Sequence, residues 1–161
     1  LWVGSDGGLT CIVGRLDRDR GQPLRMASVT STVSLAQAGI SDIAQSEDGA
    51  LWFAGATGLS RLDVSTYRHL TTAGGLPSNA VNALHVDPDA SLWIGTMGGL
   101  VHRTEERLVR YTTAHGLPDN RVYAIHRGPD GQLWLGFDAA IARFDGVRYL
   151  VKDISPSHCP W

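Results

Sequence analysis

Long hydrophobic runs are missing from this chain of 161 residues. No stretch of 18 apolar residues occurs, so the sequence predicts no membrane-spanning helix and no contact of this segment with a membrane. A basic excess is missing as well: 14 Lys and Arg residues, of which only Lys152 is a lysine, stand against 16 Asp and Glu residues. Domains that bind nucleic acid usually carry such an excess, so we expect no nucleic-acid partner.

Cysteine is scarce, with only Cys11 and Cys159 present. The two could pair in an oxidising compartment, but the sequence does not show whether their Cα atoms come within disulfide range. Neither belongs to a C-x-x-C pair, so no zinc or redox motif is present. The nucleophile elbow G-x-S-x-G, the P-loop, the dinucleotide motif G-x-G-x-x-G and the zinc motif H-E-x-x-H are also missing. These absences predict no catalytic residue, no metal and no cofactor in this chain.

The pair Leu-Trp, in contrast, occurs four times, beginning at residues 1, 51, 92 and 133. The last two intervals are both 41 residues (92 − 51 and 133 − 92), whereas the first is 50 (51 − 1), which indicates an insertion within residues 14–22. Other residues keep the same phase, among them Ile40, Val81 and Val122. The sequence thus predicts repeat units at about residues 1–34 (incomplete), 35–75, 76–116 and 117–152, followed by a tail at 153–161.

Each unit has the pattern of four short strands. In the third unit we expect them at residues 80–86, 92–96, 100–103 and 108–112, since clusters of Gly, Pro, Asp, Ser or Thr bound each run. No window shows a sustained helical period. Four short strands in every ~40–45 residues are typical of a β-propeller blade. The predicted fold is therefore all-β, a β-propeller of about four four-stranded blades.

The Trp of each Leu-Trp pair is predicted to pack between neighbouring blades. Because strands alternate, Phe53, Ile94 and Leu135, which follow these Trp residues, point to the opposite face of their strands. Both faces are then apolar, as a sheet covered on both sides requires. Counting gives three strands before Ile40 and twelve from there on. We therefore expect an open arc cut from a larger propeller, with exposed strand edges that make the isolated protein associate.

Two runs resemble the two-component regulator propeller repeat: GLPSNAVNALHVDPDASLWIGTMGGLVHR from residue 75 and GLPDNRVYAIHRGPDGQLWLGF from residue 116. The family's repeat reads roughly GLPxNxVxxIxxDxxGxLWIGTxxGLxR. It occurs in the periplasmic sensor regions of bacterial hybrid histidine kinases and related diguanylate cyclases. This chain departs from the pattern where Ala54, Ala90 and the pair Ala139-Ala140 replace glycines of the family.

The resemblance implies a non-catalytic sensor or ligand-binding propeller in the periplasm, relaying a signal to an output domain outside this chain. Any histidine kinase or cyclase activity would lie in that domain, so this chain is not expected to be an enzyme. The implied partners are a small ligand or a protein, neighbouring blades and the signalling domain. The run DGALWFAGATGLSRLD, residues 48–63, also resembles a unit of the streptogramin lyase propeller. A lyase-like propeller enzyme and a protein-docking propeller are therefore the alternatives.

The candidate ligand-binding residues lie in loops. Because antiparallel strands alternate in direction, the GLPxN joint and the loop after the Trp are expected on one face of the disc, where loops on a rigid scaffold can bind. The two Asn residues also have a structural explanation, since Asn in such a turn can bond its own backbone. The candidates are Asn79, Met97, Asn120, Arg121 and Asp138.

His85 and His126 lie 41 residues apart, at the same inner-strand position of adjacent blades. Two imidazoles near a central channel could bind a metal or relay a proton. The repeat period alone also explains the spacing, and the earlier unit has Ala44 at this position. We therefore expect no metal site at these histidines.

Overall fold

The computed structural model describes residues 2–5, 8–13, 25–28, 39–63, 67–145 and 149–153. The insertion within residues 14–22, most of the tail and any pairing of Cys159 lie outside these residues. No described segment forms a helix that is long and apolar enough to cross a membrane. The described strands are β1 (Trp2–Ser5), β2 (Gly8–Val13), β3 (Arg25–Ser28), β4 (Ile40–Gln45), β5 (Leu51–Gly55), β6 (Gly58–Leu62), β7 (Tyr67–Leu70), β8 (Val81–Val86), β9 (Leu92–Thr96), β10 (Gly99–Arg103), β11 (Leu108–Tyr111), β12 (Ala124–Arg127), β13 (Leu133–Gly136), β14 (Ala140–Phe144) and β15 (Tyr149–Asp153).

These strands form four antiparallel sheets in chain order: β1-β2-β3, β4-β5-β6-β7, β8-β9-β10-β11 and β12-β13-β14-β15. Each sheet is an up-and-down meander, because each strand pairs with the next one along the chain. Among the residues that the structure describes, the count of three strands before Ile40 and twelve from there on is confirmed. In the third sheet, β8–β11 match the predicted strands to within one residue at each end.

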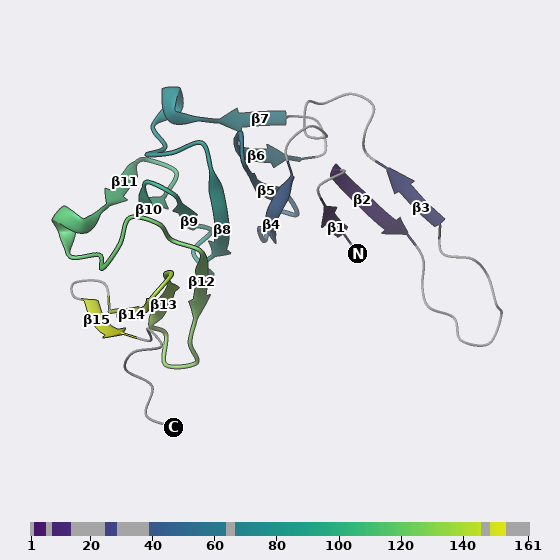
Figure 1. The fold of residues 1–161 in the computed structure, drawn as a ribbon. Coiled ribbons are helices and arrows are strands. Elements are labelled where there is room, and N and C mark those ends of the chain that lie inside the picture. Colours follow the sequence, from purple (N-terminus) through teal and green to yellow (C-terminus); the bar gives the residue numbers. More distant parts are fainter. Residues whose placement is uncertain are drawn as a thin grey trace.

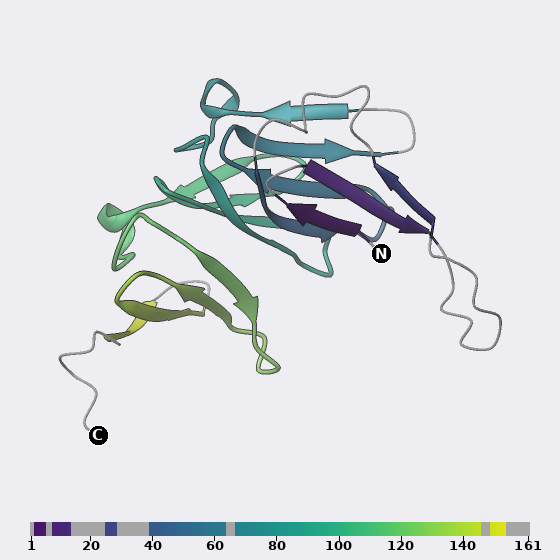
Figure 2. The ribbon, with the colours of Figure 1, turned by 45° about the vertical axis from the view of Figure 1, so that its right-hand side comes forward.

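The sheets follow one another along an arc that does not close (Figure 1). The first strands of the three complete sheets, β4, β8 and β12, lie next to one another, and β1 lies against β4. From this inner line each sheet runs outward to its last strand, as Figure 2 shows from a second direction. The predicted all-β fold and its open arc of propeller blades are confirmed.

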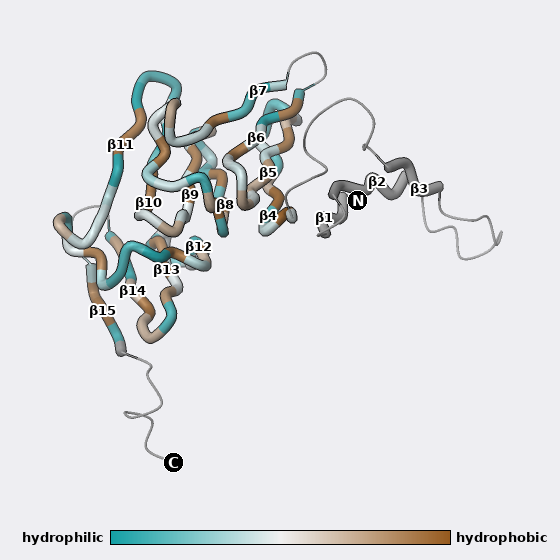
Figure 3. Tube along the Cα trace, turned by 45° about the horizontal axis from the view of Figure 1, so that its top comes forward, coloured by the Kyte–Doolittle hydropathy of each residue, from teal (hydrophilic) through white to brown (hydrophobic). Residues whose placement is uncertain are grey.

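Apolar residues lie between the blades, along the strands (Figure 3). One core cluster joins Trp52 and Leu59 of the second sheet to Ile94 of the third. The next cluster joins Trp93 of the third sheet to Leu135 of the fourth. All five residues of β9 are buried, because a sheet lies on each of its faces. The predicted packing of Trp between neighbouring blades is thereby confirmed for Trp52 and Trp93.

The turn between β8 and β9 keeps its shape despite losing a glycine. Ala90 has φ of 64°, in the left-handed region, where the equivalent Gly49 and Gly131 have φ of 83° and 76°. The turn still closes, with Ala90 N donating to the Asp87 carbonyl oxygen at 2.9 Å. An Ala side chain clashes with its own backbone in this region and a Gly does not. The turn thus keeps its backbone conformation even with a strained alanine at a position where the other two units have glycine.

Candidate functional site

The GLPxN joint is built in the same way in both copies. A short 3-10 turn precedes each joint and ends at a left-handed glycine, Gly75 with φ of 111° and Gly116 with φ of 97°. The Oδ1 atom of Asn79 accepts a hydrogen bond from Thr72 N at 2.7 Å. In the next copy Asn120 Oδ1 accepts from Thr113 N at 2.8 Å. The amide oxygens of both candidate Asn residues therefore hold the turn together.

The loop after the Trp lies beside the joint, as strand direction predicts. Met97 N donates to the Ala80 carbonyl oxygen at 3.0 Å. Gly98 lies so close to the joint that a Cβ atom there would approach the Pro77 carbonyl oxygen to 2.7 Å. We call this end of the blades the joint face. The opposite end, which carries the β8–β9 turn, is the far face.

Arg121 and Asp138, two of the candidates, contact each other on the joint face. The Arg121 guanidinium pairs with Asp138 at 2.9 Å and with Asp119 at 2.8 Å. The hydrogen bond from Arg121 lowers the pKa of Asp119, and the same contact raises the pKa of Arg121. Arg121 and Asp138 have side chains that are 46% and 52% exposed, so the pair is open to solvent. The structure thus places a fixed, accessible guanidinium between two carboxylates.

Met97 occupies the equivalent loop position one blade earlier (138 − 97 = 41). The Nδ2 atom of Asn82 lies 3.3 Å from Met97 Sδ and donates to the Val122 carbonyl oxygen at 3.0 Å. Tyr123, which holds the position of Asn82 in the next unit (123 − 82 = 41), is exposed. We call Asn82, Met97, Arg121, Tyr123 and Asp138 the joint-face cluster.

Sequence reasoning missed Asn82 and Tyr123. Asn82 follows Val81, and Tyr123 follows Val122. These two valines lie 41 residues apart, at the point where the first strand of each sheet begins after the joint. The signal was available, because three successive units have Ser, Asn and Tyr at this position while the residue before it stays aliphatic. Variation beside a constant residue indicates a surface position that packing does not determine.

The far face contains a buried carboxylate that joins two blades. Asp87, 8% exposed, accepts a hydrogen bond from Trp93 Nε1 at 2.8 Å. Arg127 from the next blade donates Nε to Asp87 Oδ1 at 2.5 Å, and its second nitrogen pairs with Oδ2. His85 Nε2 lies 3.3 Å from Asp87 Oδ1. The bidentate contact fixes Arg127 across the blade boundary and satisfies the buried charge.

The two in-phase histidines differ in environment. Burial lowers the pKa of His85, and this effect outweighs the opposing attraction of Asp87. His126 is exposed on the last sheet. Within the described residues, no group of three His, Cys, Asp or Glu side chains is arranged to hold a metal ion.

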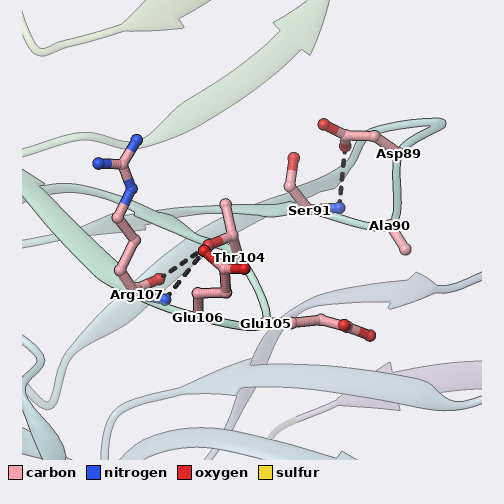
Figure 4. Close-up of a pocket in the computed structure, with 7 residues that line it drawn as sticks. All are labelled: Asp89, Ala90, Ser91, Thr104, Glu105, Glu106 and Arg107. Atoms are coloured by element: carbon pink, nitrogen blue, oxygen red, sulfur yellow. Dashed lines mark hydrogen bonds between the residues drawn. The ribbon is translucent and has the colours of Figure 1, made fainter.

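An open hollow of 410 Å³ lies on the far face (Figure 4). Polar groups that line the hollow form hydrogen bonds within two turns. Ser91 N donates to Asp89 Oδ1 at 3.0 Å, and Arg107 N donates to Thr104 Oγ1 at 3.2 Å. None of the sequence-predicted candidates lines this hollow. It is lined by Asp89, Ala90, Ser91, Thr104, Glu105, Glu106 and Arg107.

Residues 75–98 and 116–139 match the family described as two component regulator propeller. These two segments are matched by the two-component regulator propeller family. Each matched segment begins at the left-handed glycine of a joint, Gly75 or Gly116, and ends in the loop after the Trp. The matched repeats therefore include both loops that form the joint face.

Solved structures with similar folds include two extracellular domains from B. thetaiotaomicron. The extracellular domain of a putative hybrid two component system is 22% identical with a TM-score of 0.76, and the match covers 93% of this chain and 21% of that chain. The extracellular domain of a putative one component system is 19% identical with a TM-score of 0.71, covering 99% and 24%. This chain thus spans about a quarter or less of their length, and the likeness shows the propeller fold.

A virginiamycin B lyase from Staphylococcus aureus has the same kind of fold. It is 19% identical with a TM-score of 0.64, and the match covers 94% of this chain and 50% of the lyase. No curated protein matches the chain. The propeller fold of this chain is therefore one that the extracellular domains and the lyase share, so the fold alone does not determine a function.

Proposed function

We propose that this chain is a non-catalytic sensor propeller of a two-component signalling protein and that it acts outside the cytoplasm, in the periplasm. The family of the two matched segments supports the signalling role. The likeness of the fold to two extracellular sensor domains supports the location. In this proposal the signal passes to an output domain outside the chain, and any kinase or cyclase activity belongs to that domain.

The single observation that carries a binding role is the joint-face cluster. Arg121 is held in place by two carboxylates yet remains about half-exposed, so a ligand can reach its guanidinium. Fixing a side chain before binding reduces the conformational entropy lost on binding. Around it the repeats present different groups at equivalent positions, Met97 against Asp138 and Asn82 against Tyr123.

The charge of the cluster restricts the ligand. Arg121 with Asp119 and Asp138 carries a net charge of −1, from one guanidinium and two carboxylates. A neutral or cationic polar ligand fits this balance better than an anion, which the two carboxylates would repel. The exposed ring of Tyr123 adds an apolar surface with a polar tip, which suits a ligand that needs both.

Binding can be tested by thermal shift with a library of neutral and cationic polar small molecules. We expect at least one compound to stabilise the native chain, and Arg121→Ala to weaken that compound by about tenfold or more, as loss of a charge-assisted hydrogen bond does. Arg107→Ala is the matched control, because Arg107 is an exposed arginine on the far face whose backbone makes its turn contacts. If the compound binds the Arg121→Ala and Arg107→Ala variants with equal affinity, the joint-face cluster is not its binding site.

A lyase-like enzyme is the second candidate, and the likeness to virginiamycin B lyase over 94% of this chain favours it. The test is incubation of the purified chain with virginiamycin B and divalent metal. Ring opening that needs metal and is lost in His126→Ala would replace the sensor proposal. A protein-docking propeller would instead bind a protein partner through the joint face and no small molecule.

A further inference from the structure

Three charged residues on the joint face have uncharged equivalents in the preceding unit. Asp119, Arg121 and Asp138 stand where that unit has Ser78, Ala80 and Met97, each 41 residues earlier (119 − 78, 121 − 80 and 138 − 97). The preceding joint nevertheless has the same form, with its left-handed glycine and its hydrogen bond from the backbone to the Asn amide oxygen. The three charges are therefore not needed to build the joint or the loop beside it.

Asp119 shows the difference most clearly. Ser78 Oγ accepts a hydrogen bond from Ala80 N at 3.1 Å, and Asp119 Oδ1 accepts the equivalent bond from Arg121 N at 2.9 Å. A serine hydroxyl thus suffices for this turn. The carboxylate does more, because Arg121 Nε and Nη2 also donate to Asp119 Oδ2, at 3.3 Å and 2.8 Å. Asp119 therefore fixes the orientation of the Arg121 guanidinium.

The Arg121 guanidinium keeps donors for a ligand. Of its five N–H groups, Nε and one hydrogen of Nη2 bind Asp119, and Nη1 lies 2.9 Å from Asp138 Oδ2. Within the described residues, one N–H on each terminal nitrogen therefore remains without a partner. A carboxylate that approaches between the two terminal nitrogens accepts a hydrogen bond from both, which is the strongest geometry for this pair of groups.

Asp138 provides the complementary charge beside these donors. Its side chain is 52% exposed, and its ion pair with Arg121 uses Oδ2. A ligand cation can therefore reach this carboxylate while a ligand anion occupies the guanidinium. Because Nη1 and Oδ2 are only 2.9 Å apart, the two charges of such a ligand must also be adjacent.

The charges alternate across the cluster, from Asp119 through Arg121 to Asp138. The two carboxylates repel a ligand that is only anionic, and the guanidinium repels one that is only cationic. A ligand with an ammonium next to a carboxylate complements both signs. In an α-amino acid, bonds of about 1.5 Å place the nitrogen about 3 Å from the nearer carboxylate oxygen, which matches the spacing of the cluster.

Tyr123 gives the cluster an apolar surface. Its side chain is 40% exposed, and its backbone N donates to the Gly136 carbonyl oxygen at 2.9 Å, beside the strand end that leads to Asp138. Asp119 and Asp138 raise the pKa of Arg121, and Tyr123 adds a smaller effect in the same direction, so its ring lies near the guanidinium. An aromatic ring at this place suits an uncharged side chain of the ligand.

We propose that the joint-face cluster binds a free α-amino acid with an uncharged side chain, whose carboxylate contacts Arg121 and whose ammonium contacts Asp138. The inference rests on the proposed binding role of the joint face and names the ligand class for it. A longer peptide fits less well, because its ammonium and its carboxylate lie at opposite ends of the chain.

The test is isothermal titration calorimetry of the native chain with L-alanine, L-leucine and L-phenylalanine. The amino acid that binds most tightly is then compared with its amide, which keeps only the ammonium, and with its N-acetyl derivative, which keeps only the carboxylate. We expect each derivative to bind about tenfold more weakly or worse, because each loses one set of charge-assisted hydrogen bonds.

Two variants assign the charges of the ligand to residues. Arg121→Gln should abolish the preference for the amino acid over its amide, and Asp138→Asn should abolish the preference over the N-acetyl derivative. Glu106→Gln, at an exposed position on the far face, is the control and should leave both preferences unchanged. A variant that only misfolds cannot give this crossed result, because misfolding removes the binding of all probes together.

A derivative that binds the native chain as tightly as the amino acid would overturn the proposal, and so would the absence of binding by all three amino acids. These failures differ from a failure of the proposed function. If a compound from the thermal-shift library still requires Arg121, the joint face binds a ligand of another class. If no compound requires Arg121, the binding role of the joint face is wrong as well.

Discussion

The indole of Trp93 meets the ring of Phe144, from the next blade, edge to face, with ring centroids 5.9 Å apart and an interplanar angle of 76°. Edge-to-face pairs of this kind stabilise a structure beyond the apolar area that they bury. This contact joins two sheets that share no strand-to-strand ladder. Side chains between blades therefore contribute much of the stability of the arc, together with single hydrogen bonds such as that from Val122 N to the Thr96 carbonyl oxygen at 3.0 Å.

Trp93→Ala should lower the free energy of unfolding by about 3–5 kcal/mol, the cost of emptying a large buried site. Trp134→Ala is the matched control, because it removes the same side chain from the half-exposed equivalent position. We expect it to cost less than about 1 kcal/mol. Urea denaturation followed by circular dichroism measures both values. Equal losses would show that Trp134 is packed as tightly as Trp93, contrary to the structure.

The Asp87–Arg127 contact should be coupled energetically across the blade boundary. A double-mutant cycle with Asp87→Ala and Arg127→Ala is expected to give a coupling energy of about 1–3 kcal/mol. The reason is that Asp87 is buried and its carboxylate accepts a hydrogen bond from the charged guanidinium of Arg127. The ion pair between Asp48 and Arg61 is the control, because Asp48 is exposed. Its coupling should be clearly smaller, because solvent screens an exposed ion pair. Additive losses at Asp87 and Arg127 would show that the contact does not hold the blades together.

Ala90→Gly should stabilise the protein, by about 1 kcal/mol, because Ala90 adopts a left-handed conformation that costs little for glycine. The reverse change at the equivalent position, Gly131→Ala, should cost a similar amount. Space is available there, since a Cβ atom at Gly131 would have no neighbour within 4 Å. Thermal unfolding of the two variants measures the opposite signs. A loss of stability in Ala90→Gly would show that the turn gains more from the Ala side chain than it loses in strain.

Stability should fall as the pH drops below about 6.5, partly through His85. Burial, with help from Arg127 and His126, lowers the pKa of His85 in the folded state, and Asp87 opposes the change. The unfolded chain therefore binds a proton at His85 before the folded chain does. The stabilisation is fully present above the ordinary histidine pKa of about 6.5 and is lost as the pH falls through the lowered value.

Melting temperature as a function of pH tests this dependence. We expect His85→Gln to flatten the curve between pH 7 and pH 5. His115→Gln, at an exposed position in the joint-face turn, is the control and should leave the slope unchanged. If His85→Gln shows the same slope of melting temperature against pH as the native protein, the pH dependence arises from other groups.

Much of the fold could be predicted from one sequence because a period of 41 residues keeps the strands of the last three sheets in phase. The Leu-Trp pair identifies a strand covered on both faces, and β9 is buried along its whole length. The Asp87–Arg127 contact could not be predicted in the same way. Equivalent positions of Asp87 hold Ser46 and Gly128, so the carboxylate is a property of one boundary only.

The candidate site was predicted in part. Arg121 and Asp138 were predicted as loop residues on one face of the disc, and the structure shows that they form one ion pair. Asn82 and Tyr123 were missed although their position varies between units, because only the placement of the neighbouring blade shows that this varying position lies beside the loop after the Trp.

The central claim is that recognition resides in residues of the joint face that differ between repeats. Chemical-shift mapping of the isotope-labelled chain, with a compound that stabilises it, tests this claim most directly. The account predicts that the largest changes fall on Asn82, Arg121 and Tyr123. Changes concentrated instead around Asp89 and Glu105, in the hollow of the far face, would contradict it.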